Sequence, residues 1–112
     1  MVQLMNEEHK VNYYRAALAA ANTGDLTTAK RLASCCEILQ QENRAAKLLE
    51  LIEPQITLVR EHNIRGLNYA KRGHYRRALK QFDAATRLDC GNLLARQAQL
   101  ACRAAKKRWF FW

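Results

Sequence analysis

The sequence has little of what a β-sheet requires. Its 112 residues include only 4 Gly and 1 Pro, and Val, Ile and Thr together fill 12 positions. β-Branched residues favour strands, whereas Gly and Pro favour turns, so this scarcity excludes a β-sandwich, a barrel, a collagenous rod and a doubly wound nucleotide-binding fold. Ala and Leu instead fill 18 and 15 positions, which favours helix almost throughout a single domain.

Patterns typical of catalysis and of metal binding are also missing. We find no Ser or Cys beside a His at a workable spacing, no glycine-rich phosphate loop and no paired carboxylates in an apolar setting, so we expect no enzyme and no cofactor. The histidines are scattered and no C-x-x-C pair occurs, so we expect no metal site. We read no secretory signal in residues 1–10 and expect reduced thiols in a cytoplasmic protein. The cysteines are Cys35, Cys36, Cys90 and Cys102.

Positive charge is concentrated in the second half of the sequence. The formal net charge is +9; residues 1–58 carry 6 basic and 7 acidic side chains, and residues 59–112 carry 13 basic and 3 acidic ones. This excess suits acidic partners, but it also fits a solvated helix surface that keeps a small protein soluble. No nucleic-acid motif accompanies it, so nucleic acid ranks last among the partners. The basic residues singled out are Arg72, Arg76, Arg77, Lys80, Arg103, Lys106, Lys107 and Arg108.

Apolar residues recur at helical spacing in six segments separated by polar breaks. Gly24 and Gly73 each suit the left-handed stop that ends a helix. Pro54 favours a helix start over a helix interior, so residues 44–71 form either two helices or one long helix bent at the proline. The six segments begin near Asn6, at Leu26, at about residue 44, at Pro54, at Tyr75 and at about residue 92.

Two segments, residues 10–43 and 59–92, look alike when they are aligned on their small residues. Each contains a helix, a Gly, a bulky apolar residue two positions later, an Ala three positions beyond that, and a terminal Asn. In the second segment these residues have the spacing of the tetratricopeptide repeat, a pair of helices with a period of about 34 residues. The matching residues are Gly66, Tyr69, Gly73, Tyr75, Ala78, Phe82 and Ala85.

The sequence therefore resembles the tetratricopeptide-repeat family over most of residues 10–105. The resemblance implies an all-α fold in which antiparallel helical hairpins stack as a short right-handed solenoid of about six helices over residues 1–108. An inserted helix over about 44–53 separates the two repeats, and a closing helix covers about 92–107. The second repeat departs from the family at His62, Arg65 and Cys90, where the family has Trp, Leu and Pro. The weaker first repeat matches at Tyr13, Ala17, Gly24, Leu26, Ala29, Ala33 and Cys36.

The resemblance also implies a concave, partly basic groove that binds a peptide or helix of a partner protein. An acidic and apolar segment would suit it, and the protein would act as an adaptor, chaperone or assembly factor. The alternative is that the inserted helix or the closing helix fills the groove. The expected lining residues are Tyr14, Leu18, Ala21, Arg60, Asn63, Leu67, Lys71, Leu94 and Gln97.

An aromatic run ends the chain and suggests a second kind of function. Trp109, Phe110, Phe111 and Trp112 directly follow three basic residues. One interpretation is that they fold back on the helical domain, and another is that they dock on a partner or a second copy. A third is a peripheral, membrane-associated domain on an anionic surface, because Trp and basic side chains favour that interface. They would also suit the start of a spanning helix if the chain is a fragment.

Overall fold

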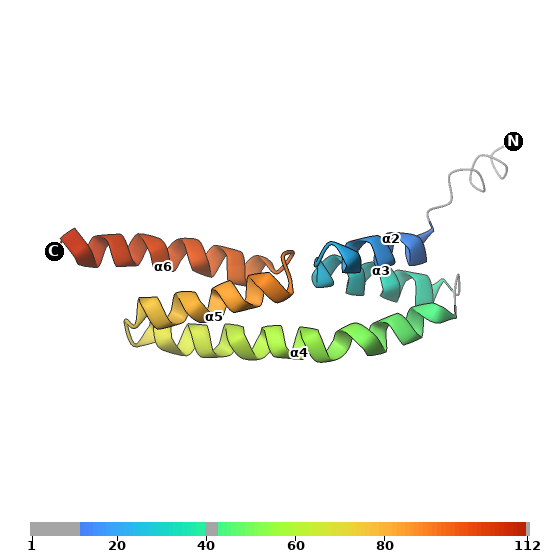
Figure 1. Cartoon of the computed structure of the whole chain (residues 1–112), viewed down its shortest axis with the longest axis horizontal. Helices are drawn as coiled ribbons and strands as arrows, with labels where there is room; N and C mark the ends of the chain where they lie inside the picture. The colour runs from blue at the N-terminus through green and yellow to red at the C-terminus, as the bar shows by residue number, and fades with distance from the viewer. Residues whose placement is uncertain (1–11, 40–42, 112) are drawn as a thin grey trace, which may run out of the picture.

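The computed structural model describes the backbone of residues 12–39 and 43–111, and side chains as far as Lys106. Within those ranges it contains helices and no strand, which confirms the all-α class (Figure 1). The helix start expected near Asn6 lies outside the described residues. The helices are α2 (Tyr13–Asn22), α3 (Leu26–Ile38), α4 (Arg44–Lys71), α5 (Tyr75–Leu88) and α6 (Leu93–Phe111).

Helix α4 runs along one side of an elongated molecule (Figure 1). The radius of gyration is 18.4 Å, whereas a compact domain of this length would have about 13 Å. Helix α3 packs on α2 and on the first half of α4, and α5 packs on the second half of α4 and on α6 (Figure 1). We call α2, α3 and residues 44–56 the first unit, and residues 59–71, α5 and α6 the second unit.

Residues 44–71 form one continuous helix, so the expected inserted helix over 44–53 is not a separate element. Pro54 lies inside α4, where it cannot donate a backbone hydrogen bond to the carbonyl of Glu50. Both residues are exposed, so water can hydrate that carbonyl. The helix continues through the proline because apolar side chains before and after it, at Ile52 and Val59, are buried in the two units.

The turn between α2 and α3 follows the sequence prediction. Gly24 adopts a left-handed backbone with φ of +86°, a conformation that side-chain-bearing residues rarely adopt. The carboxylate of Asp25 then caps α3 by accepting a hydrogen bond from the Thr28 amide at 3.1 Å. Gly73 has a φ of +81° after α4 and confirms the second expected stop.

The second unit is held together by close approach of α4 and α5. Gly66 is buried, and a Cβ placed there would lie 2.7 Å from the ring of Phe82, so the ring occupies the space that a side chain would need. Ala78 is also buried, which confirms the expected small-residue contacts. At His62, where the family has Trp, the imidazole Nδ1 lies 2.8 Å from Oε1 of Gln81 on α5.

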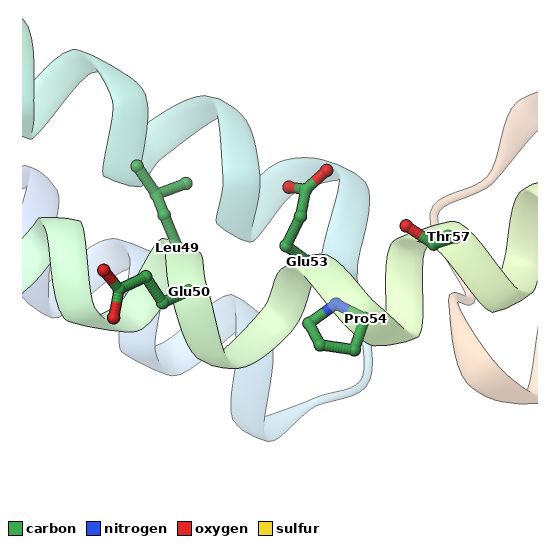
Figure 2. Close-up of a pocket in the computed structure, with 5 residues that line it drawn as sticks. All are labelled: Leu49, Glu50, Glu53, Pro54 and Thr57. Atoms are coloured by element: carbon green, nitrogen blue, oxygen red, sulfur yellow. The ribbon is translucent and has the colours of Figure 1, made fainter.

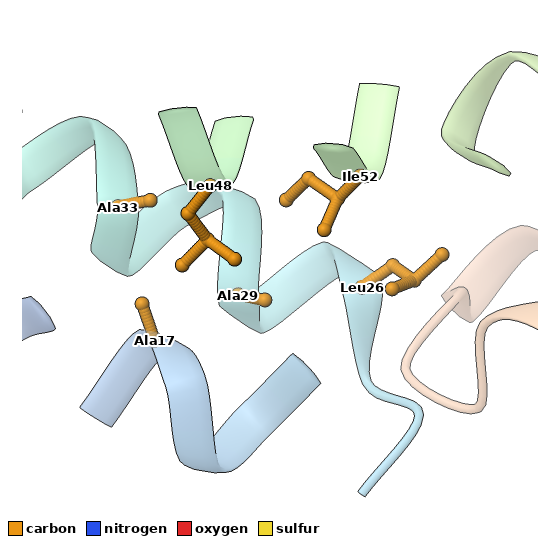
Figure 3. Close-up of a cluster of buried hydrophobic side chains, with 6 residues drawn as sticks. All are labelled: Ala17, Leu26, Ala29, Ala33, Leu48 and Ile52. Atoms are coloured by element: carbon orange, nitrogen blue, oxygen red, sulfur yellow. The ribbon is translucent and has the colours of Figure 1, made fainter. Parts of the chain in front are cut away.

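The helices of the first unit are packed together by different residues from those of the second unit. Ala33 is fully buried on α3, as Phe82 is on α5, but its side chain is much smaller, so less side-chain volume lies between the helices of the first hairpin. Leu48 and Ile52 of α4 fill the remaining space beside α2 and α3, and the side chain of Leu48 reaches between Ala17 and Ala33 (Figure 3). Residues of α4 therefore complete a core that the first hairpin could not close alone.

Candidate functional site

A cleft lies where the two units meet. It has a volume of about 310 Å³ and receives side chains from the start of α3, the middle of α4, and the turn into α6. We call it the junction cleft. Its lining residues are Thr27, Lys30, Ile56, Val59, Arg60, Asn63, Ile64, Leu67, Asp89, Asn92 and Leu94.

The structure brings together four of the nine predicted groove residues, namely Arg60, Asn63, Leu67 and Leu94. The other five do not line this cleft. Lys71 and Gln97 are exposed elsewhere on the second unit. The α2 residues Tyr14, Leu18 and Ala21 pack instead against the core of the first unit.

Apolar side chains are exposed around the cleft. Ile64, Leu67 and Leu94 expose 52%, 47% and 47% of their surfaces although each is a large aliphatic residue. They come from two different helices and converge on one depression. A contiguous apolar surface of this kind marks a binding site more often than single exposed leucines do.

Two cations accompany these apolar side chains. The Arg60 side chain is exposed and forms no ion pair within the part of the chain that the structure describes. The ammonium of Lys30 lies 3.7 Å from the carboxylate of Glu53, and both side chains are about half exposed. A pair this accessible contributes little stability and can exchange its partner. The cleft thus combines an apolar surface with positive charge.

A buried amide joins α4 to the start of α6 beside the cleft. Asn63 is only 7% exposed, and its Nδ2 donates to Oδ1 of Asn92 at 3.1 Å. That same Asn92 oxygen accepts from the Ala95 amide at 3.0 Å, so Asn92 is fixed as the cap of α6. The arrangement orients Asn63 and leaves its own Oδ1 without a hydrogen-bond partner. That oxygen has almost no accessible surface, so a ligand in the cleft does not reach it in this conformation, and its burial without a partner costs stability.

Asp89 closes the floor of the cleft, and the sequence analysis did not predict this role. It is 2% exposed, and it joins the units by accepting hydrogen bonds from Thr27 on α3. The sequence identified residues 89–92 only as a turn, because no local signal shows that this carboxylate reaches a helix 62 positions away. Thr27 and Lys30 were missed for the same reason, whereas Ile64, four residues after Arg60 on α4, could have been found from helical spacing.

A second depression follows the first half of α4, but a single helix forms it. It has a volume of about 520 Å³ and is lined by residues of α4 alone (Figure 2). Its lining residues are Leu49, Glu50, Glu53, Pro54 and Thr57. One helix cannot surround a ligand, so this surface is a weaker candidate than the junction cleft.

The predicted basic residues lie mainly on the second unit. Arg72, Arg76, Arg77 and Lys80 are exposed and form no ion pair with any residue that the structure describes. Arg103 lies 3.9 Å from the carboxylate of Asp83, and Lys106 is exposed. The side chains of Lys107 and Arg108 lie outside the described residues.

The aromatic run can be followed only as backbone. Helix α6 continues through Phe111, so the chain does not turn back at Trp109. The side chains of Trp109, Phe110 and Phe111, and the whole of Trp112, lie outside the described residues. No helix in the described ranges is both long enough and apolar enough to cross a membrane.

The cysteines form no disulfide, and no three His, Cys, Asp or Glu side chains among the described residues gather into a metal site. Cys36 and Cys102 are buried, Cys35 is partly buried and Cys90 is exposed. Burial raises the pKa of the Cys102 thiol above its ordinary value, because the thiolate would lose hydration there.

No protein-family model, curated protein or solved structure matches the chain.

Proposed function

We propose that this chain is a non-catalytic protein-interaction module of the tetratricopeptide-repeat type that binds a segment of a partner protein at the junction cleft. The observation that carries the proposal is the exposed apolar surface of Ile64, Leu67 and Leu94 beside the cation of Arg60. Burying that surface against a partner would supply the main part of the binding free energy. Binding of a partner segment would be sufficient for a role as an adaptor, chaperone or assembly factor.

The chemistry of the cleft selects the partner segment. Carboxylates of the partner would approach Arg60 and Lys30, and its apolar side chains would cover Leu67 and Leu94. An acidic and apolar segment, bound in extended form or as a helix, meets both conditions.

Matched variants test this assignment. The paired change Leu67→Glu and Leu94→Glu is compared with Leu100→Glu, which alters an exposed leucine of α6 outside the cleft. Tagged proteins are used to capture partners from the source cells, and the captured proteins are quantified by mass spectrometry. We expect the cleft variant to lose specific partners that the Leu100→Glu protein retains. An identical captured set for both variants would refute the assignment.

A second pair of variants tests the contribution of charge. Arg60→Ala removes a cation that lines the cleft, whereas Lys71→Ala removes one from the same helix outside it. Arg60→Ala should weaken capture and reduce its dependence on salt, because one attractive charge is lost. Equal effects of the two changes would mean that only the overall positive charge matters.

Association with an anionic membrane is a second candidate function, and it concerns the end of the second unit that lies away from the junction cleft. The turn between α4 and α5, which begins at Arg72, and the C-terminal end of α6 lie at the same end of the molecule (Figure 1). Four basic residues near that turn have no acidic partner within the described ranges, which suits an anionic surface. Sedimentation with phosphatidylserine vesicles tests this. Deletion of residues 109–112 should abolish sedimentation and leave partner capture intact, and lack of sedimentation by the full chain would exclude it.

A further inference from the structure

The cores of the two units are separate. No buried residue belongs to both clusters, and the connection within α4 is narrow. Ile56 is the last residue of α4 that packs on the first core, and Val59 is the first of the second core. Thr57 and Leu58 between them are exposed. Pro54, one turn earlier, removes a backbone hydrogen bond from the same stretch, so α4 bends most easily there.

A polar contact between two turns forms the other connection. One Asp89 oxygen accepts hydrogen bonds from the amides of Thr27, at 3.1 Å, and Gly91, at 3.2 Å. The other oxygen accepts from the Thr27 hydroxyl at 2.6 Å. The Thr27 amide belongs to the first turn of α3, where a carboxylate is favoured by the helix dipole. A residue of the second unit therefore caps a helix of the first.

The surrounding backbone fits this contact closely. The Cys90 amide donates to the carbonyl of Gly24 at 3.0 Å, which adds a direct bond between the two turns. Gly91 lies so close to Asp25 that a Cβ at this position would collide with the carboxylate. Both turns must therefore keep their shapes for the contact to close. We call the contacts of Asp89 with Thr27 and of Cys90 with Gly24 the latch.

We propose that the latch is a conformational device that fixes the angle between the two units and thereby assembles the junction cleft. Thr27 and Lys30 contribute one side of the cleft from the first unit, and Asn63 and Leu94 contribute the other from the second. Bending of α4 after Pro54 with the latch open separates these sides. A ligand held between them stabilises the closed state, because it binds the open state less well. This last step rests on the proposed function, whereas the latch itself does not.

Distance measurements test the latch without any ligand. Spin labels are attached through encoded non-natural amino acids at the exposed Arg31 of α3 and Arg96 of α6, so that the native cysteines remain. We expect one narrow distance distribution in the parent protein and a broader one, shifted in its mean, in Asp89→Ala. Asp83→Ala is the matched control, because Asp83 bonds Gln99 and Arg103 within the second unit. Its distribution should stay narrow.

A milder variant keeps the test decisive if Asp89→Ala loses helix content. Thr27→Val removes only the hydroxyl donor to Asp89 and leaves the amide bond in place. Broadening in Thr27→Val, with helix content unchanged by circular dichroism, supports the latch. A distribution as narrow as that of the parent, in either latch variant that keeps its helices, overturns it.

Partner capture separates the latch from the proposed function. If both hold, Asp89→Ala reduces capture as the paired change at Leu67 and Leu94 does. Broadened distances with undiminished capture in Asp89→Ala would overturn the coupling of the latch to the cleft. Capture that the paired change at Leu67 and Leu94 does not affect would overturn the proposed function, and the distance measurements would still decide the latch.

Discussion

Replacement of Gly66 by Ala tests the packing of the second unit. The added Cβ would lie 2.7 Å from two ring carbons of Phe82, and the Phe82 side chain is fully buried. Overpacking of this kind costs about 1–3 kcal/mol. Ala in place of Gly inside a helix recovers about 1 kcal/mol. The free energy of unfolding should therefore fall by about 0–2 kcal/mol.

A double-mutant cycle isolates the contact. In a Phe82→Leu background the aromatic ring is absent, so Gly66→Ala should instead stabilise the protein by up to about 1 kcal/mol. Urea denaturation followed by far-ultraviolet circular dichroism measures all four proteins, and the coupling free energy should be about 1–3 kcal/mol. An equal stabilisation by Gly66→Ala in both backgrounds would refute close contact between α4 and α5.

Four further predictions follow from the structure. Leu48→Ala should lower the free energy of unfolding in urea by about 2–5 kcal/mol, because it empties the first core, and the exposed Leu51→Ala should change it by less than about 0.5 kcal/mol. Pro54→Ala should raise the free energy of unfolding by about 2 kcal/mol, because the gain from the restored helix hydrogen bond exceeds the cost of a more flexible unfolded chain. An unchanged thermal midpoint would contradict this. A thiol reagent should modify Cys90 before the buried cysteines, as mass spectrometry of partly labelled protein would show. Because folding raises the pKa of Cys102, its stabilising contribution should be complete below the thiol pKa of the unfolded chain. The contribution should be lost as the pH rises through that value toward the folded pKa, so the free energy of unfolding should decline over this range. The decline should be smaller in Cys102→Ala, as urea denaturation at a series of pH values would show.

The helices were predictable because their signals are local. Gly24 and Gly73 end helices where the chain must adopt a left-handed backbone, and Asp25 caps the helix that follows. Gly66 and Ala78 were predictable as contact residues because two crossing helices need small side chains at their closest approach. Pro54 was ambiguous, since burial on both sides of it, which no local rule contains, decided that α4 continues.

The candidate site was only partly predictable. Arg60, Asn63 and Leu67 share one face of α4, so their helical spacing placed them together. Tyr14 was assigned to the same groove from the order of the repeats alone. It lies instead in the first unit, with the guanidinium of Arg44 4.7 Å from its ring centroid. Spacing along one helix predicts a shared face, but it does not predict which other helix lies opposite.

The all-α class, the small residues where helices approach and the turns with left-handed glycines could all be predicted from the sequence, because each depends on residues close together in the chain. The tertiary structure alone shows that the hairpins follow one another along α4, that Asp89 caps α3 and that Asn63 is buried beside a cleft between two units. Those features depend on contacts between residues far apart in the sequence, and such contacts form only when both cores are packed.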